Sequence, residues 1–250
     1  MGFEGRLFVV IPAFNEVKGI TRTLEALAAQ GDRDFELVVV DNDSTDGTAE
    51  LVRAFPGLSA HVIHEAQKGT GAAADTGMRA AIELGATHLA RTDADCLPLP
   101  DWTAAVKRAF GEGLDLVSGQ LLPRLDEPDV KRYQRWVLLG AVELASAVGK
   151  VRPGNRDPEY LGPYVMTPGC NMAITADLYL RAGGFPRTKI EDLHEDRALV
   201  NAVRKLTTAY GLRRYVRVRG SSRRVGAWGL RNTLAWYADH RYRPEHVDIR

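Results

Sequence analysis

Two aspartates with one small alanine between them, Asp93 and Asp95, come directly after an apolar run in "THLARTDADC". In an extended chain, residues two apart point to the same face, so the two carboxylates are expected to lie side by side. Neighbouring like charges are unfavourable unless a cation or hydroxyl groups compensate them. The spacing therefore predicts a site for a positive charge, for ligand hydroxyls, or for both.

Further acidic side chains follow the other predicted strands of the first half of the chain. In open α/β sheets, ligands bind beyond the carboxyl ends of the strands, so these side chains are expected at one edge. A nucleotide sugar would suit them, because carboxylates can bind ribose and base, and a hard divalent ion can bridge carboxylate and diphosphate. Asp46 also suits a helix cap. The set comprises five aspartates, one glutamate and one lysine: Asp41, Asp43, Asp46, Asp93, Asp95, Glu16 and Lys68.

The elements that must position these side chains alternate between short apolar runs and helical patterns. The runs are continuously apolar, which is typical of parallel strands buried on both faces by helices. Asn15, Asp101 and one of residues 44–46 are expected to cap helices. Beyond residue 120 the pattern changes to a helix, a loop rich in Pro and Gly, a strand, two helices and a late strand. The predicted strands are 6–13, 35–42, 60–66, 87–96, 114–119, 169–174 and 213–220, and the later helix and loop are 128–149 and 150–168.

Composition sets broad limits on function. The chain has 250 residues, 45% hydrophobic and 26% charged, with a formal net charge of +1, so overall charge does not favour nucleic acid. No stretch approaches the roughly 18 apolar residues of a membrane span, and we expect a cytoplasmic protein. Residues 213–250 hold ten arginines and three acidic residues, which favours contact with phosphate or a membrane surface. The tryptophans at 102, 136, 228 and 236 are expected in the core.

Seven motifs in order carry a resemblance to a known family. They are "VVIPAFNE", "VVVDNDSTDGT", "KGTGAAADTGMRAA", "RTDADC", "GCNMAI", "GGF" and "HEDRAL". Over roughly residues 6–205 the chain resembles the family 2 glycosyltransferases, which have the GT-A fold. The resemblance implies a mostly parallel central sheet flanked by helices, and inverting transfer from a nucleotide sugar, usually a UDP-sugar, with Mn²⁺ or Mg²⁺. It implies one GT-A domain over 1–250, with a Rossmann-like nucleotide-sugar-binding half at 1–119, a smaller acceptor and catalytic half at 120–212, and a basic C-terminal extension at 213–250.

The resemblance also assigns roles to individual residues. "HEDRAL" places the general base at Asp196, with Glu195 beside it. The sequence "IEDLHEDRAL" offers a second Glu-Asp pair, so Asp192 is the alternative base. Asp196 is favoured because a helical pattern continues from it, as in the family. The implied donor contacts are Pro12, Ala13 and Glu16 for the nucleoside pocket, Asp41 for the uracil with Asp43 nearby, and Lys68 and Gly69 along the nucleotide. Asp93 would take the ribose or the metal and Asp95 the metal, with Ala94 between them.

Arg223 and Arg224 resemble a C-terminal element of some family members. Guanidinium groups suit phosphate geometry, so the pair could close over the diphosphate, and a surface pair is the alternative. The sequence leaves three classes of acceptor: a small molecule, a cell-wall precursor and a lipid-linked glycan. The Arg-rich tail would allow a peripheral membrane contact.

Other function classes also fit parts of the sequence. "GTGAAA" at 69–74, with Asp93 about 20 residues on, matches the fingerprint of an NAD(P)-dependent oxidoreductase. That fingerprint belongs after the first strand, whereas here it follows the third. A nucleotidyltransferase would carry a basic Gly-rich loop after the first strand, and none is present. A non-catalytic nucleotide-sugar-binding protein is the remaining alternative.

Overall fold

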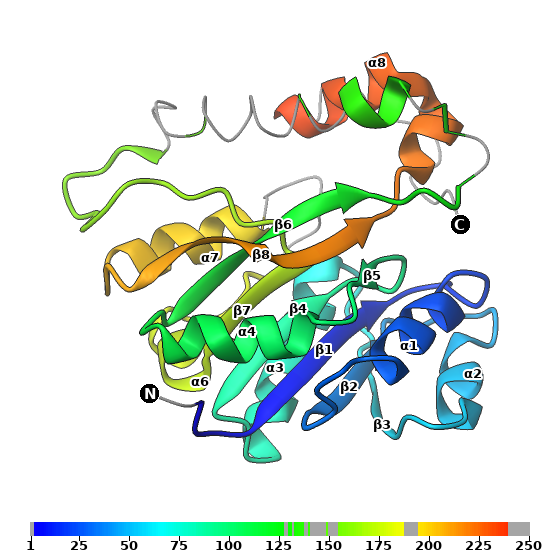
Figure 1. The fold of residues 1–250 in the computed structure, drawn as a ribbon, viewed down its shortest axis with the longest axis horizontal. Helices are drawn as coiled ribbons and strands as arrows, with labels where there is room; N and C mark the ends of the chain where they lie inside the picture. Colours follow the sequence, from blue (N-terminus) through cyan, green and yellow to red (C-terminus); the bar gives the residue numbers. More distant parts are fainter. Residues whose placement is uncertain are drawn as a thin grey trace.

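Eight strands form one sheet in the computed structural model, which describes residues 3–127, 130, 131, 133–137, 140, 149, 155–187 and 195–239. Helices cover both faces of the sheet, so the mixed α/β fold is confirmed (Figure 1). The strands are β1 Leu7–Ala13, β2 Glu36–Asp41, β3 Ala60–His64, β4 His88–Thr92, β5 Leu97–Pro98, β6 Leu116–Pro123, β7 Asn171–Thr175 and β8 Tyr210–Gly220. The helices are α1 Ile20–Ala28, α2 Thr48–Ala54, α3 Thr70–Glu83, α4 Trp102–Gly111, α6 Ala176–Arg181, α7 Glu195–Arg204 and α8 Arg223–Asp239.

The sheet order is β3-β2-β1-β4-β7-β6-β8-β5. The first four strands in that order are parallel, as expected for the first half of the chain. The late strand β7 inserts antiparallel between β4 and β6, so the predicted fifth parallel strand is not next to the fourth. The short β5, which closely follows β4 in sequence, pairs with β8 at the far end of the order. The sheet therefore curls, and the segment after β4 comes close to the last strand.

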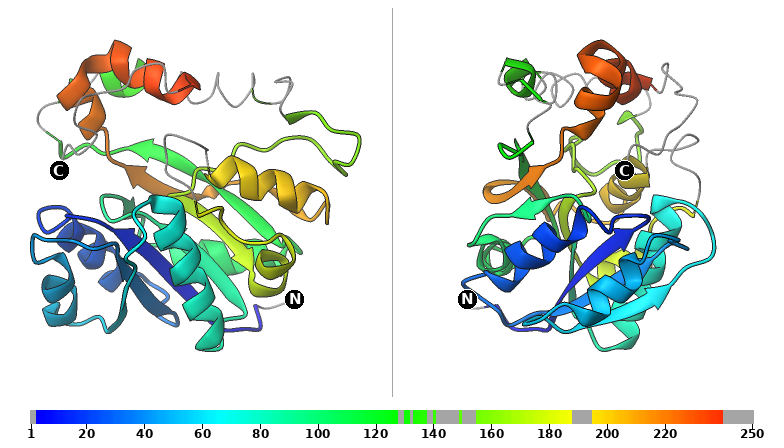
Figure 2. Two further views of the ribbon diagram at one scale, coloured as in Figure 1. Left: turned by 180° about the vertical axis from the view of Figure 1, so that it is seen from behind. Right: turned by 90° about the vertical axis from the view of Figure 1, so that its right-hand side faces the viewer.

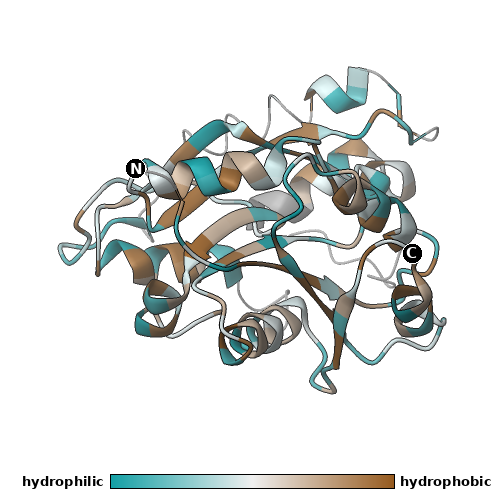
Figure 3. Cartoon of the chain, turned by 60° about the horizontal axis from the view of Figure 1, so that its bottom comes forward, coloured by the Kyte–Doolittle hydropathy of each residue, from teal (hydrophilic) through white to brown (hydrophobic). Residues whose placement is uncertain are grey.

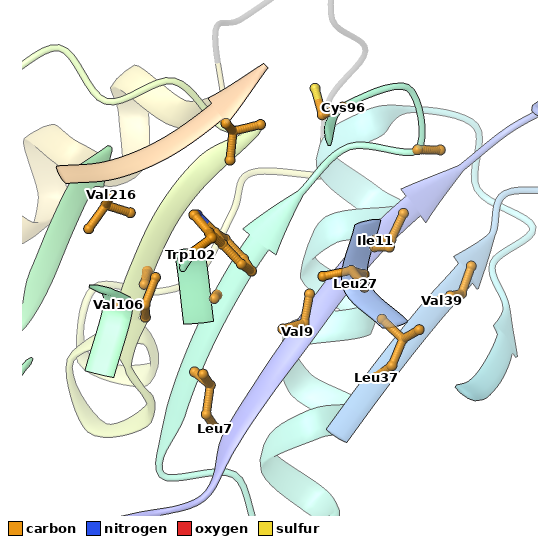
Figure 4. Close-up of a cluster of buried hydrophobic side chains, with 14 of the residues drawn as sticks. Leu7, Val9, Ile11, Leu27, Leu37, Val39, Cys96, Trp102, Val106 and Val216 are labelled. Carbon is orange, nitrogen blue, oxygen red and sulfur yellow. The ribbon is translucent and has the colours of Figure 1, made fainter. Parts of the chain in front are cut away.

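Alternate residues of β1 enter two separate cores. Val9 and Ile11 pack with α1, α2 and α4 on one face, the cluster drawn in Figure 4. Phe8 and Val10 pack with α3, α6 and α7 on the other face, which Figure 2 shows from behind. Because both faces are covered, β1 is apolar along its whole length, and Figure 3 shows hydrophobic colouring on the central strands.

The predicted helix caps are confirmed only in part: Asp101 occupies the N-cap position of α4, but Asn15 does not cap α1. Asn15 lies before α1 in the left-handed region, at φ 51°, and its side chain accepts a hydrogen bond from the Thr45 N–H at 2.9 Å. The N-cap positions of α1 and α2 are Gly19 and Gly47, with no side-chain cap bond. Asn15 instead joins the loops after β1 and β2, a role that local sequence does not reveal.

Asp101 stands at the N-cap of α4 without a cap bond, because its carboxylate pairs with Arg217 of β8 at 3.0 Å. Asp46 accepts from the N–H groups of Val17 and Thr48, each at 3.0 Å. It therefore ties the start of α2 to the loop after β1. Asp101 therefore connects α4 to β8, whereas Asp46 also accepts from the first N–H group of α2, as a capping side chain does.

The second half of the chain is described in part. Residues 133–137 are helical, within the predicted helix 128–149, and 156–168 form no helix or strand. Trp102 is fully buried, but Trp136 is 69% exposed, so the expectation of a core position is wrong for Trp136. The expected division at residue 213 falls inside β8. No helix in the described part of the chain is long and apolar enough to cross a membrane.

Candidate functional site

The carboxyl ends of β1 and β2 lie next to each other and bring the first candidates together. Ala13 and Asp41 are partners in register, and Pro12 pairs with Val40. Asp41 is 9% exposed, and its carboxylate accepts from the Ser44 N–H at 3.3 Å. The described non-glycine residues with positive φ are Asn15 and Asp43, both in the loops at this edge. Backbone strain of this kind collects at ligand-binding loops.

The loop that carries Asp93, Ala94 and Asp95 is fixed from two sides. The Thr23 hydroxyl of α1 donates to the carbonyl of Ala94 at 2.7 Å and to that of Cys96 at 2.8 Å. Arg124, in the segment after β6, donates to the carbonyl of Asp95 at 2.9 Å. Because separate elements hold its backbone, this loop presents its carboxylates in a defined position.

Arg223, the first residue of α8, joins two of the predicted acidic residues. Its guanidinium binds both carboxylate oxygens of Glu16, at 3.0 and 2.6 Å, and contacts Asp95 Oδ2 at 3.1 Å. Burial opposes the charge, but Glu16 and Asp95 outweigh it and raise the pKa of Arg223. The neighbouring Arg224 lies 5.9 Å from the Trp228 ring. Arg223 therefore brings the start of α8 to the edge of the sheet that carries Glu16 and Asp95.

A second arginine, Arg91 of β4, joins Asp93 to Glu195. Its Nη2 lies 3.3 Å from Asp93 Oδ1 and 3.5 Å from Glu195 Oε1. Arg91 is 1% exposed, and although burial opposes its charge, the carboxylates of Asp93, Glu195 and Asp196 raise its pKa. Burial raises the pKa of Asp93, and the charge of Arg91 opposes that shift. The predicted donor loop and the predicted base motif therefore meet around one buried cation.

Asp196 follows Glu195 at the start of α7. Its carboxylate accepts from the Arg197 N–H at 2.6 Å and also interacts with the backbone of Gly169. Burial raises the pKa of Asp196, while these interactions and the charge of Arg91 oppose the shift. A carboxylate with a raised pKa holds a proton more readily, which suits a general base. The alternative, Asp192, lies outside the described residues.

The loop between β3 and α3 depends on Asn42, which is 5% exposed. Its Nδ2 donates to the carbonyls of Glu65 and Gln67, each at 2.8 Å, and its Oδ1 accepts from the Gly69 N–H at 2.9 Å. Lys68 pairs with Asp43 Oδ2 at 3.2 Å, and its hydrogen bond is the main reason that the pKa of Asp43 is lowered. Asn42 therefore holds the loop that carries Lys68 and Gly69.

Three residues of the site were missed by the sequence reasoning: Arg91, Arg124 and Asn42. A signal was available for Arg91, since a charged residue inside an otherwise buried strand is rare without a buried partner. Asn42 lies inside the quoted motif "VVVDNDSTDGT" but attracts no notice beside three aspartates. Arg124 could not be identified, because its role depends on the curl of the sheet.

The acidic pair could contribute to a metal site. The side chains of Asp93 and Asp95 are 34% and 19% exposed, and they offer the oxygen donors that Mg²⁺ and Mn²⁺ prefer. Among the described residues, no group of three or more His, Cys, Asp or Glu side chains could hold a metal by itself. Mg²⁺ is commonly held by one or two carboxylates together with substrate phosphates, and this pair fits that arrangement.

Comparison with known sequences finds similarity to glycosyltransferases. The sequence model described as "Glycosyl transferase family 2" matches residues 8–175. Glycosyltransferase AglE of Haloferax volcanii is 35% identical over 119 residues, covering 45% of this chain and 38% of AglE. An undecaprenyl-phosphate mannosyltransferase of Micrococcus luteus is 36% identical over 117 residues, covering 46% and 47%. The chain thus spans less than half the length of both relatives.

Solved structures share the fold. The mannosyltransferase PcManGT from Pyrobaculum calidifontis, solved with GDP-Man and Mn²⁺, superposes with a TM-score of 0.65 at 25% identity. That match covers 95% of this chain and 63% of PcManGT. S. aureus TarS 1–349, solved with UDP-GlcNAc, gives a TM-score of 0.64 at 17% identity and covers 87% of this chain and 58% of TarS. The eight-stranded sheet and its helices therefore have the architecture of GT-A glycosyltransferases.

Proposed function

Since this chain belongs to glycosyl transferase family 2, we propose that it transfers a sugar from a nucleoside-diphosphate donor to an acceptor hydroxyl with inversion. The observation that carries the proposal is the contact of Arg91 with both Asp93 and Glu195. It joins the loop proposed for the donor to the helix proposed for the base. A transferase needs these two parts on either side of one sugar.

On the donor side, Pro12, Ala13 and Glu16 would line the nucleoside pocket, and Asp41 and Asp43 would receive the base. Two observations support the placement of these residues around one nucleoside. The strands β1 and β2 are paired, and Asn42 is hydrogen-bonded to the Lys68–Gly69 loop. We favour a UDP-sugar from the family resemblance. GDP is the alternative, since PcManGT was solved with GDP-Man.

Asp93 and Asp95 would hold Mn²⁺ or Mg²⁺ together with oxygens of the diphosphate. When bound, the ion would neutralise negative charge on the departing nucleoside diphosphate. Arg223 already contacts Asp95 and Glu16 at this edge, and its guanidinium fork suits a diphosphate. Arg223 would therefore add positive charge near the leaving group, with Arg224 beside it on α8.

On the acceptor side, Asp196 would accept the proton of the attacking hydroxyl. The oxygen would form its bond to the anomeric carbon from the face opposite the diphosphate, which leaves with the electron pair of the broken bond. Burial raises the pKa of Asp196, and this strengthens it as a base. Glu195 would stay paired with Arg91 and hold the start of α7 in place.

For the acceptor we propose a hydroxyl of a lipid-linked glycan at a membrane surface. Tyr133 and Trp136 are 60% and 69% exposed, and such aromatic side chains favour the membrane interface. Residues 213–250 are rich in arginine, which attracts anionic lipid, although Arg213, Arg217 and Arg223 pair with acids of this chain. The name of the Micrococcus luteus relative, which includes undecaprenyl phosphate, points the same way.

Thermal shift with UDP, GDP and dTDP, each with and without Mn²⁺, tests the donor proposal first. We expect one nucleotide to raise the melting temperature, and more so with Mn²⁺. Asp196→Asn should keep that shift but lower transfer by about a hundredfold or more, the range for loss of a general base. Asp177→Asn on the exposed end of α6 is the matched control and should transfer normally. If no nucleoside diphosphate binds, the donor proposal is wrong.

The oxidoreductase alternative is not favoured. The "GTGAAA" glycines open α3, which follows β3, whereas a dinucleotide fingerprint follows the first strand of its unit. An increase in nicotinamide fluorescence on mixing NAD(P)H with the protein would reopen this alternative.

A further inference from the structure

Arg91 is a charged residue in the interior of the molecule, between two parts of the proposed active site. On one side it contacts Asp93, and on the other Glu195. We propose that Arg91 is a positioning residue that sets the start of α7, and with it Asp196, relative to the Asp93–Asp95 loop. This inference deepens the proposed function and rests on it for its catalytic consequence.

Arg91 acts through other residues, because a substrate cannot reach it. The residue is 1% exposed, and its Nη1 has no hydrogen-bond partner among the described residues. The Phe185 ring lies 5.0 Å from the guanidinium carbon. A Cβ at Gly169 would lie 3.1 Å from that carbon and from Nη1, so the backbone at Gly169 packs directly against the group. The guanidinium is therefore enclosed.

The first residue of α7, Glu195, also lies against α3. A Cβ added at Gly71, in the first turn of α3, would lie 3.5 Å from Glu195 Cβ and 2.3 Å from the carbonyl oxygen of Pro186. The backbone of Gly169 in turn interacts with the Asp196 carboxylate. The start of α7 thus lies against α3 and the turn before β7, and Arg91 is its ionic link to β4.

The chemistry of this link requires arginine. Arg91 offers both Nε and Nη2 to Asp93 Oδ1, each at 3.3 Å, while Nη2 also faces Glu195. The guanidinium of arginine is a planar fork that can bind two carboxylates at once. Lysine has one nitrogen at the end of a flexible side chain and cannot reproduce this geometry. Without the cation, the carboxylates of Asp93 and Glu195 would repel each other across the gap. The expected result is a displaced α7, and small misplacement of catalytic groups can cost about a hundredfold in rate.

Arg91→Lys, Glu195→Gln and their double variant test the inference in a double-mutant cycle. Each single change should lower kcat by about tenfold or more. The double variant should have a kcat no lower than that of the more impaired single variant, because both changes break the same Arg91–Glu195 contact. Glu195→Gln should leave the Kd for the nucleoside diphosphate within about threefold, since it is on the far side of Arg91 from the donor loop. Arg181→Lys, an exposed arginine on α6, is the matched control and should match the unmodified protein.

Hydrogen–deuterium exchange of residues 195–204 gives a readout independent of activity. We expect Arg91→Lys and Glu195→Gln each to speed exchange in α7, with no change in α1. The inference is overturned if the kcat losses multiply in the double variant, or if exchange in α7 is unchanged. If Arg91→Lys does not fold, hydrogen–deuterium exchange of residues 195–204 in Glu195→Gln alone tests whether the Arg91–Glu195 contact positions α7. A protein that binds no nucleoside diphosphate would defeat the proposed function, whereas the exchange result would still decide the role of Arg91.

Discussion

Replacing Asn42 by alanine would remove the side chain that holds the Lys68–Gly69 loop. The amide makes three hydrogen bonds at 2.8 to 2.9 Å, to the carbonyls of Glu65 and Gln67 and from the N–H of Gly69. With alanine at this position, the three backbone groups must form hydrogen bonds with water instead. The change is therefore a direct test of whether this loop binds the donor.

The expected magnitude follows from the number of bonds. Each intramolecular hydrogen bond contributes about 1 kcal/mol net, so the loss should lower the free energy of unfolding by about 3 kcal/mol. Domains of this kind are stable by about 5–15 kcal/mol, so the variant should still fold. If the released loop is ordered in about one molecule in ten, the apparent Kd for the nucleoside diphosphate rises about tenfold.

Urea unfolding and calorimetric titration of the nucleoside diphosphate with Mn²⁺ measure the two effects. Asn201→Ala is the control, because Asn201 in α7 accepts from Arg204 at 2.8 Å and does not contact the loop. We expect it to lower stability without weakening nucleotide binding. Asn42→Asp should be worse than alanine at neutral pH, because its carboxylate would face two carbonyl oxygens.

One result would refute this reasoning. If Asn42→Ala lowers the urea midpoint as expected but leaves the Kd unchanged, the Lys68–Gly69 loop does not contact the donor. The assignment of Lys68 and Gly69 to the nucleotide would then be wrong, whatever the rest of the site does.

Three further predictions concern the metal, the base and the core. Asp95→Ala should remove the Mn²⁺-dependent part of nucleotide affinity in calorimetry, and an unchanged Mn²⁺ dependence would remove Asp95 from the metal site. Asp196→Asn should raise the melting temperature at pH 7. Its folded pKa is above that of the unfolded chain, so the ionised carboxylate opposes folding, and the gain should vanish as pH falls below about 3.9. Trp102→Phe breaks the 2.9 Å bond to buried Asn171 and should cost about 1–3 kcal/mol in urea unfolding, with nucleotide binding retained.

Much of the first half of the fold could be predicted from the sequence, because its strands and helices carry strong local patterns. A continuous apolar run such as that of β1 is explained by cores on both faces, and this follows from the residues alone. The insertion of β7 between β4 and β6 could not be predicted, since strand order depends on long-range pairing. Asn15 and Asp101 make no cap bond for a related reason: they meet partners distant in the chain that compete with their own helices.

In the candidate site, too, local sequence motifs predict some features, whereas others depend on residues that are distant in the sequence. Motifs at the ends of strands locate the acidic residues, because a strand end is a local feature. They do not show how the charges are compensated, because Arg91 and Arg223 each pair with an acid from a distant part of the sequence. Arg223 reaches Glu16 across 207 positions, and Arg91 reaches Glu195 across 104.

The two arginines explain how acidic side chains can gather at one edge of the sheet. Like charges that approach without compensation raise one another's pKa and oppose folding. Arg223 contacts Glu16 and Asp95, and Arg91 contacts Asp93 and Glu195, so each cation stands between two acids from different elements. Because one acid of each pair is in the Asp93–Asp95 loop, this loop is the point where α8 and α7 both attach. The charges that the site needs for chemistry therefore also determine how its parts are assembled.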